Sequence, residues 1–146
     1  MAAAAVRSAR AHDSLRPIRN DRLEIRHDKL KGRGVFALAP IAAGTLIEAA
    51  PVIIVPEKDC PLLDRTILHD YYFRWDGDPD SGAGGEGRGA VALGLVALCN
   101  HSRRPRARVR RNFAQGTLDL VALVTIAAGD EVTIDYNCPL WFAAED

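Results

Sequence analysis

Cysteine is scarce in this chain, and the spacing of the few present argues against two classes of protein. Three cysteines occur among 146 residues, namely Cys60, Cys99 and Cys138. An odd number of widely separated thiols fits neither a disulfide framework nor the CxxC pairs of a structural zinc site. We therefore expect reduced thiols, no metal centre and a location inside the cell.

Long apolar runs and an excess of one charge are also missing. No apolar stretch approaches the roughly 20 residues that cross a bilayer, and the chain start lacks the apolar region of a secretory signal. Nineteen basic and nineteen acidic residues give a formal net charge of +0, which favours neither nucleic acid nor an acidic substrate. The expectation is a soluble domain without a membrane partner.

The first 20 residues are rich in alanine and arginine and contain one acid, Asp13. A mitochondrial transit peptide shares this composition, although a flexible tail is the simpler interpretation. We predict a tail over residues 1–20 and one domain over residues 21–146, since a chain of this length forms one core. The Ala, Arg, Gly and Asp bias hints at a GC-rich bacterial genome. This favours a bacterial cytoplasm, with a nuclear or host-targeted location as the alternatives.

Short β-branched or alternating runs bounded by glycine or proline dominate the rest of the sequence. Short helices are expected around residues 62–68 and 92–99, and a hairpin around Gly116. The sequence therefore predicts a mostly β domain with one or two short helices. The strand-like runs are residues 23–26, 35–38, 45–48, 51–56, 107–110 and 118–123.

Three separated segments carry the residues with chemical potential. They are Gly32-Arg33-Gly34-Val35-Phe36-Ala37, Asn100-His101-Ser102, and the run from Ala122 that ends in Asp135-Tyr136. In this order and spacing the chain resembles the SET family of lysine methyltransferases from about Asp21 to Phe142. The resemblance implies a SET-domain fold, a β-clip of several short curved sheets with a C-terminal pseudoknot. It also implies methyl transfer from S-adenosylmethionine to a protein lysine, with S-adenosylhomocysteine as the other product.

The family's methyl donor is held largely by main-chain atoms, and the glycine segment supplies part of them. By resemblance, Asn100 and His101 hold the adenine and methionine ends of the donor. The alternatives are a plain turn for the glycines and a hydrogen-bonded core histidine for His101. In the glycine segment the expected donor contacts are Arg33, Gly34, Val35 and Phe36.

Tyr136 is the expected catalytic residue, which also contacts the donor while it orients the lysine amine. A buried structural tyrosine is the alternative. Tyr72 is expected to line the lysine channel, because aromatic faces attract an ammonium. Ile134 stands where the family's residue is linked to the number of methyl groups added, and Trp141 is placed to cover the donor or the channel.

Two departures from the family pattern keep other functions open. Arg106 follows Pro105 where the family has asparagine, and the cysteine-rich zinc segments that flank many SET domains are absent. A donor-binding or protein-binding module without catalysis is therefore an alternative. The arginines of residues 103–111 raise a third hypothesis, a nucleic-acid-binding β-domain, but their alternation favours a solvated strand face. The expected partners are a lysine-bearing protein, such as a histone, and a second copy of the chain.

Overall fold

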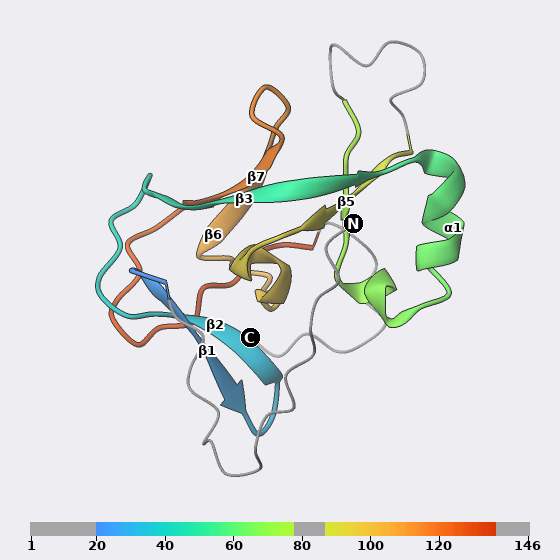
Figure 1. Ribbon diagram of the computed structural model, residues 1–146. Helices are drawn as coiled ribbons and strands as arrows, with labels where there is room; N and C mark the ends of the chain where they lie inside the picture. The colour runs from blue at the N-terminus through green and yellow to red at the C-terminus, as the bar shows by residue number, and fades with distance from the viewer. Residues whose placement is uncertain (1–19, 78–86, 137–146) are drawn as a thin grey trace, which may run out of the picture.

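The computed structural model describes residues 20–77 and 87–136, which form two sheets (Figure 1). The smaller sheet pairs β1 with β2, and the larger has the strand order β4-β5-β3-β7-β6. The mostly β prediction is thus confirmed. The strands are β1 (Leu23–Asp28), β2 (Gly32–Ala37), β3 (Leu46–Val55), β4 (Phe73–Arg74), β5 (Gly89–Ala92), β6 (Ala107–Asn112) and β7 (Thr117–Ala122).

Helical structure is confined to single turns among the described residues. The expected helix around residues 62–68 is split into α1 (Cys60–Leu63) and the 3₁₀ turn η2 (Ile67–Asp70), preceded by η1 (Glu57–Asp59). The expected helix over residues 92–99 is the 3₁₀ turn η4 (Leu95–Leu98), which lies between the two sheets in Figure 1. Within residues 20–77 and 87–136 no helix is long and apolar enough to cross a membrane.

The two runs expected at residues 45–48 and 51–56 form one continuous strand, β3. Its first half pairs with β7 and its second half with β5, and Pro51 lies at the change of neighbour. The carbonyl oxygen of Pro51 accepts a hydrogen bond from Leu93 N–H at 2.8 Å, on the β5 side. The N–H and C=O groups of one residue in an antiparallel strand point to the same side. Since the carbonyl of Pro51 points toward the β5 side, an N–H at this residue would point there too, and its absence removes no bond to β7.

Residues 129–136, called the threaded segment below, run between β2 and the part of the chain that follows η4. On one side Val132 N–H donates to the carbonyl oxygen of Val35 at 2.8 Å. On the other side Ile134 N–H donates to the carbonyl oxygen of Asn100, and Ser102 N–H to that of Ile134, both at 3.0 Å. The three sequence segments singled out above are therefore neighbours in the fold.

The hydrophobic core fills the space between the sheets and fixes the threaded segment in place. Val132 is 0% exposed and Ile134 1% exposed, and both belong to the same buried cluster as Val35 of β2 and Val96 of η4. Fully burying an aliphatic side chain of this kind stabilises a fold by about 1.5–3 kcal/mol. Packing as well as hydrogen bonds therefore holds the segment that ends in Tyr136.

Candidate active site

Asn100 connects the glycine segment to the threaded segment. Its Nδ2 atom donates to the carbonyl oxygen of Arg33 at 3.1 Å and to Oε1 of Glu131 at 2.7 Å. A side-chain amide has two N–H donors, and both are used here. No described residue donates a hydrogen bond to the Oδ1 atom of Asn100, so this oxygen is an acceptor that a ligand can use.

Gly34 is buried directly against this amide and carboxylate. A Cβ atom built at Gly34 would stand 2.7 Å from Oε1 of Glu131 and 3.0 Å from Nδ2 of Asn100. Neither distance is compatible with a side chain unless the neighbours move. Glycine is needed here because of close approach, since it lets the Asn100 amide and the Glu131 carboxylate lie on the backbone of β2.

His101 receives a hydrogen bond from the threaded segment. The backbone N–H of Tyr136 donates to Nδ1 of His101 at 3.1 Å, and the two rings are 5.3 Å apart with 55° between their planes. An accepting Nδ1 carries no proton, so the ring proton is on Nε2. Oδ1 of Asp135 is also 3.7 Å from Nδ1, but with this geometry that contact is not an ion pair.

The hydroxyl of Tyr136 is fixed by a second bond to the same part of the chain. It donates to the carbonyl oxygen of Cys99 at 2.9 Å. A phenol that donates its only proton retains lone pairs on oxygen. The hydroxyl oxygen is therefore held in one orientation, and an oxygen of this kind has the chemistry to accept a hydrogen bond from an amine N–H. The thiol of Cys99 is itself buried, and burial raises its pKa, so it is no nucleophile.

Glu48 of β3 supports the turn that delivers Asn100 and His101. Its two carboxylate oxygens accept hydrogen bonds from the N–H groups of Leu95 at 3.0 Å and Val96 at 2.9 Å, the first residues of η4. These N–H groups have no partner within a helical turn. Sequence reasoning missed both Glu48 and Glu131, because each acts on a residue far away along the chain.

Phe36 and Arg33 take part in the same neighbourhood through different atoms. Phe36 forms an isolated β-bridge with Glu131, and the guanidinium carbon of Arg26 lies 5.0 Å from the centre of its ring. Arg33 contributes the carbonyl oxygen that Asn100 binds. The fold thus brings together the segments that carry the expected donor contacts, which are Arg33, Gly34, Val35, Phe36, Asn100, His101 and Tyr136.

The two residues predicted for the lysine channel have other contacts. Tyr72 donates its hydroxyl proton to Oδ1 of Asp64 at 2.6 Å, and this bond, with burial, raises the pKa of Tyr72 to about 12. The side chain of Ile134 is buried in the core. A channel role for Tyr72 and Ile134 stays a prediction, and Trp141 lies outside the described residues.

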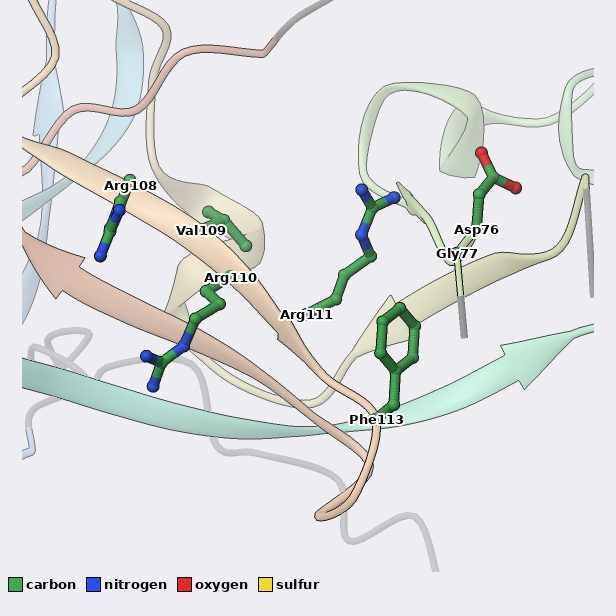
Figure 2. A pocket seen from close by; sticks show the side chains of 7 residues that line it. All are labelled: Asp76, Gly77, Arg108, Val109, Arg110, Arg111 and Phe113. Atoms are coloured by element: carbon green, nitrogen blue, oxygen red, sulfur yellow. The ribbon is translucent and has the colours of Figure 1, made fainter. Parts of the chain in front are cut away.

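The arginines of β6 lie on an exposed face, as their alternation predicted, and two of them also make contacts within the protein. Nη2 of Arg110 is 3.0 Å from Oδ2 of Asp119, and Arg111 donates to the carbonyl oxygen of Arg74 at 3.4 Å. Figure 2 shows Arg111 extending from β6 toward Asp76 and Gly77 across a hollow of about 400 Å³. Two of the arginines therefore serve internal contacts.

Comparisons with known proteins identify the family of this chain. A family model described as the SET domain matches residues 32–137. The H3 lysine-37 specific histone-lysine N-methyltransferase of the fission yeast Schizosaccharomyces pombe is 34% identical over 130 residues, which is 88% of this chain and 82% of the relative.

Two solved structures share the fold. A Plasmodium falciparum protein described as a candidate histone methyltransferase superposes with a TM-score of 0.62 at 24% identity, over 84% of this chain and 99% of that one. A Neurospora SET domain protein, a histone lysine methyltransferase, gives a TM-score of 0.64 at 20% identity, over 85% of this chain and 55% of that one.

Proposed function

The chain belongs to the SET-domain family of protein-lysine methyltransferases, and we propose that it methylates a histone lysine with S-adenosylmethionine as the methyl donor. One observation carries the proposal. Hydrogen bonds connect the three motifs: Asn100 binds the backbone of the glycine segment at Arg33, and Tyr136 binds His101 through its backbone N–H. The hydroxyl of Tyr136 binds the backbone of Cys99, the residue before Asn100. Backbone groups and short polar side chains of this kind suit the polar parts of a nucleoside bearing an amino acid.

The residues present fit the donor at two points. The Oδ1 atom of Asn100 is available as an acceptor for an N–H group of the adenine or the amino-acid end, because the amide N–H groups are both used elsewhere. The Nε2–H of His101 is a donor that suits a carboxylate, because Nδ1 already accepts from Tyr136. S-adenosylmethionine supplies an electrophilic methyl group on a positively charged sulfur.

Tyr136 is the catalytic residue in this proposal, and its task is orientation. A lysine has a pKa of about 10.4, so supplying the neutral amine at about pH 7.4 costs roughly 4 kcal/mol. The neutral amine has N–H groups that can donate a hydrogen bond to the oxygen of Tyr136. The amine lone pair forms the new N–C bond while the C–S bond breaks, which leaves neutral S-adenosylhomocysteine and a methylated ammonium. Holding the amine in line with the C–S bond lowers the free-energy barrier, because the reacting atoms are already close together and correctly oriented.

A histone substrate also bears on the location of the protein. The relative named above is a histone-lysine methyltransferase from a fission yeast, so the comparisons give no support to the bacterial source that composition indicated. Histones of a eukaryotic cell are nuclear. The proposal therefore favours the nuclear alternative over a bacterial cytoplasm.

Methyl transfer tests the function directly. Purified protein is incubated with isotopically labelled S-adenosylmethionine and either recombinant histones or a whole-cell lysate, and methylated lysines are mapped by mass spectrometry. We expect transfer by the wild type and by Tyr71→Phe, a matched tyrosine outside the site, and none by Tyr136→Phe. If the wild type binds the donor but modifies no protein, the chain is a binding module and the catalytic proposal is wrong.

A further inference from the structure

Arg106 stands at the position where this chain departs from the family pattern, and its guanidinium reaches the threaded segment. Its Nη1 atom donates to the carbonyl oxygen of Glu131 at 3.0 Å, and its Nη2 atom lies 3.7 Å from Oδ2 of Asp130. Its backbone N–H donates to Oγ1 of Thr133 at 3.3 Å. One residue therefore contacts three residues of the threaded segment.

The residue that Arg106 holds is the one that orients Asn100. The backbone carbonyl of Glu131 accepts from Arg106, while the side-chain Oε1 of Glu131 accepts from Nδ2 of Asn100 at 2.7 Å. The same carboxylate lies 3.9 Å from Nζ of Lys31. A shift of the Glu131 backbone therefore moves the acceptor that fixes the Asn100 amide.

We propose that Arg106 is a positioning residue for the methyl donor, acting through Glu131 on Asn100. The inference rests on the proposed function, because it requires that Asn100 bind the donor. A guanidinium replaces the asparagine of the family pattern with a charged donor on a longer side chain. Since hydrogen bonds to charged groups are roughly twice as strong as neutral ones, the arginine provides a firm hold on the carbonyl.

Arg106 acts on donor binding rather than on the chemical step. The bonds that orient Tyr136 go to His101 and to the carbonyl oxygen of Cys99. Arg106 makes no hydrogen bond to either residue within residues 20–77 and 87–136. Removing the guanidinium should therefore weaken donor affinity and leave turnover at saturating donor close to that of the wild type.

The test compares Arg106→Ala and Arg106→Lys with Arg108→Ala. Arg108 is in β6, two residues after Arg106, which lies just before that strand. It is exposed and lines the hollow of Figure 2, and among the described residues it makes no hydrogen bond or ion pair to the threaded segment. Donor Kd is measured by calorimetry, and KM and kcat by methyl transfer. We expect Arg106→Ala to raise Kd and KM for the donor about tenfold, the equivalent of 1.4 kcal/mol, with kcat within about threefold. Arg106→Lys should recover most of the affinity, and Arg108→Ala should match the wild type.

A coupling measurement covers the case in which Arg106→Ala unfolds. Arg106→Gln, which removes the guanidinium, and Glu131→Gln are combined, and their effects on donor Kd should be less than additive because Arg106 acts on Asn100 through the side chain of Glu131. Additive effects overturn the proposal, as does an unchanged Kd in Arg106→Ala or a fall in kcat as large as the rise in KM. Failure of the wild type to bind the donor at all points instead to failure of the proposed function.

Discussion

The hydroxyl of Tyr136 donates a hydrogen bond to the carbonyl oxygen of Cys99, 2.9 Å away. Cys99 directly precedes Asn100 and His101, and the backbone N–H of Tyr136 donates to His101. Tyr136 therefore holds the end of the threaded segment against residues 99–101, both by its backbone and by its side chain. Replacement of tyrosine by phenylalanine removes the side-chain bond to Cys99 and keeps the backbone bond to His101, so the two roles of this residue can be separated.

Tyr136→Phe should affect activity far more than stability. Loss of one partly buried hydrogen bond, with the Cys99 carbonyl left without this donor, costs about 1–3 kcal/mol of unfolding free energy. Loss of the oriented acceptor should lower kcat at least about 100-fold. Urea unfolding and methyl transfer are measured on the same preparations. A fall in activity that merely follows the unfolded fraction would contradict a catalytic role.

Gly34→Ala should abolish the close approach between β2 and the polar cluster. The new Cβ atom would meet Oε1 of Glu131 at 2.7 Å and a ring carbon of Phe36 at 3.1 Å. Overpacking of this kind costs about 1–3 kcal/mol. Donor binding should weaken at least about tenfold, because the methyl group displaces the Glu131 carboxylate and with it the Asn100 amide. Calorimetry with S-adenosylmethionine measures the binding.

A second glycine of the same strand provides the control for Gly34→Ala. Gly32 has a φ of +74° and no atom within 4 Å of the place where a Cβ would stand, so Gly32→Ala introduces backbone strain without a clash. It should cost about 1–2 kcal/mol and leave donor binding close to that of the wild type. Equal losses of binding in the two variants would show that strain in β2, and not the contact with Glu131 and Asn100, is what matters.

Glu48→Ala should loosen η4 and destabilise the fold by about 2 kcal/mol, because two N–H groups lose a charged acceptor. Glu48→Gln retains an acceptor oxygen and should cost about half as much. The ordering Ala, then Gln, then wild type is checked by urea unfolding. Glu57→Ala, an exposed glutamate at the start of η1, is the control and should change stability little; a loss there as large as at position 48 would argue against the specific role of Glu48.

The arrangement of the segments was predictable where the signal was local or carried by a family pattern. The hairpin around Gly116 follows from a turn residue between two strand-like runs, and β6 and β7 have the expected pairing. The meeting of Gly34, Asn100 and Tyr136 follows from the family resemblance. None of these predictions required knowledge of which distant side chains touch.

The supporting residues could not be predicted in this way, because each depends on a long-range contact. Glu48 binds Leu95 and Val96, which follow it by 47 and 48 positions in the sequence. Glu131 binds Asn100, which precedes it by 31 positions. Nothing in the composition around Glu48 distinguishes it from other strand glutamates. We expected two strands here, because a proline normally ends a strand. That expectation was wrong, because β3 is continuous and Pro51 lies where β3 changes from one neighbouring strand to the other.

The cluster of Asp64, His69 and Tyr72 should make stability depend on pH. Asp64 accepts bonds from Tyr72 and from Nδ1 of His69, which lower the pKa of Asp64 from 3.8 and raise that of His69 from 6.5. The contribution of Asp64 is lost as pH falls through its lowered pKa. That of His69 is complete below pH 6.5 and is lost as pH rises through its raised pKa. The cluster therefore stabilises the fold most between these two limits.

Asp64→Asn isolates this effect, because other titrating groups cancel when it is compared with the wild type. The difference in unfolding free energy should be largest between pH 3.8 and pH 6.5 and should shrink as His69 loses its proton. The bond from Tyr72 persists at higher pH, since the pKa of Tyr72 is raised from 10.0 to about 12. Ultraviolet titration should therefore show one tyrosine shifting toward its ordinary pKa in Asp64→Asn. A difference in stability that does not vary with pH would mean that His69 is not coupled to Asp64 in solution.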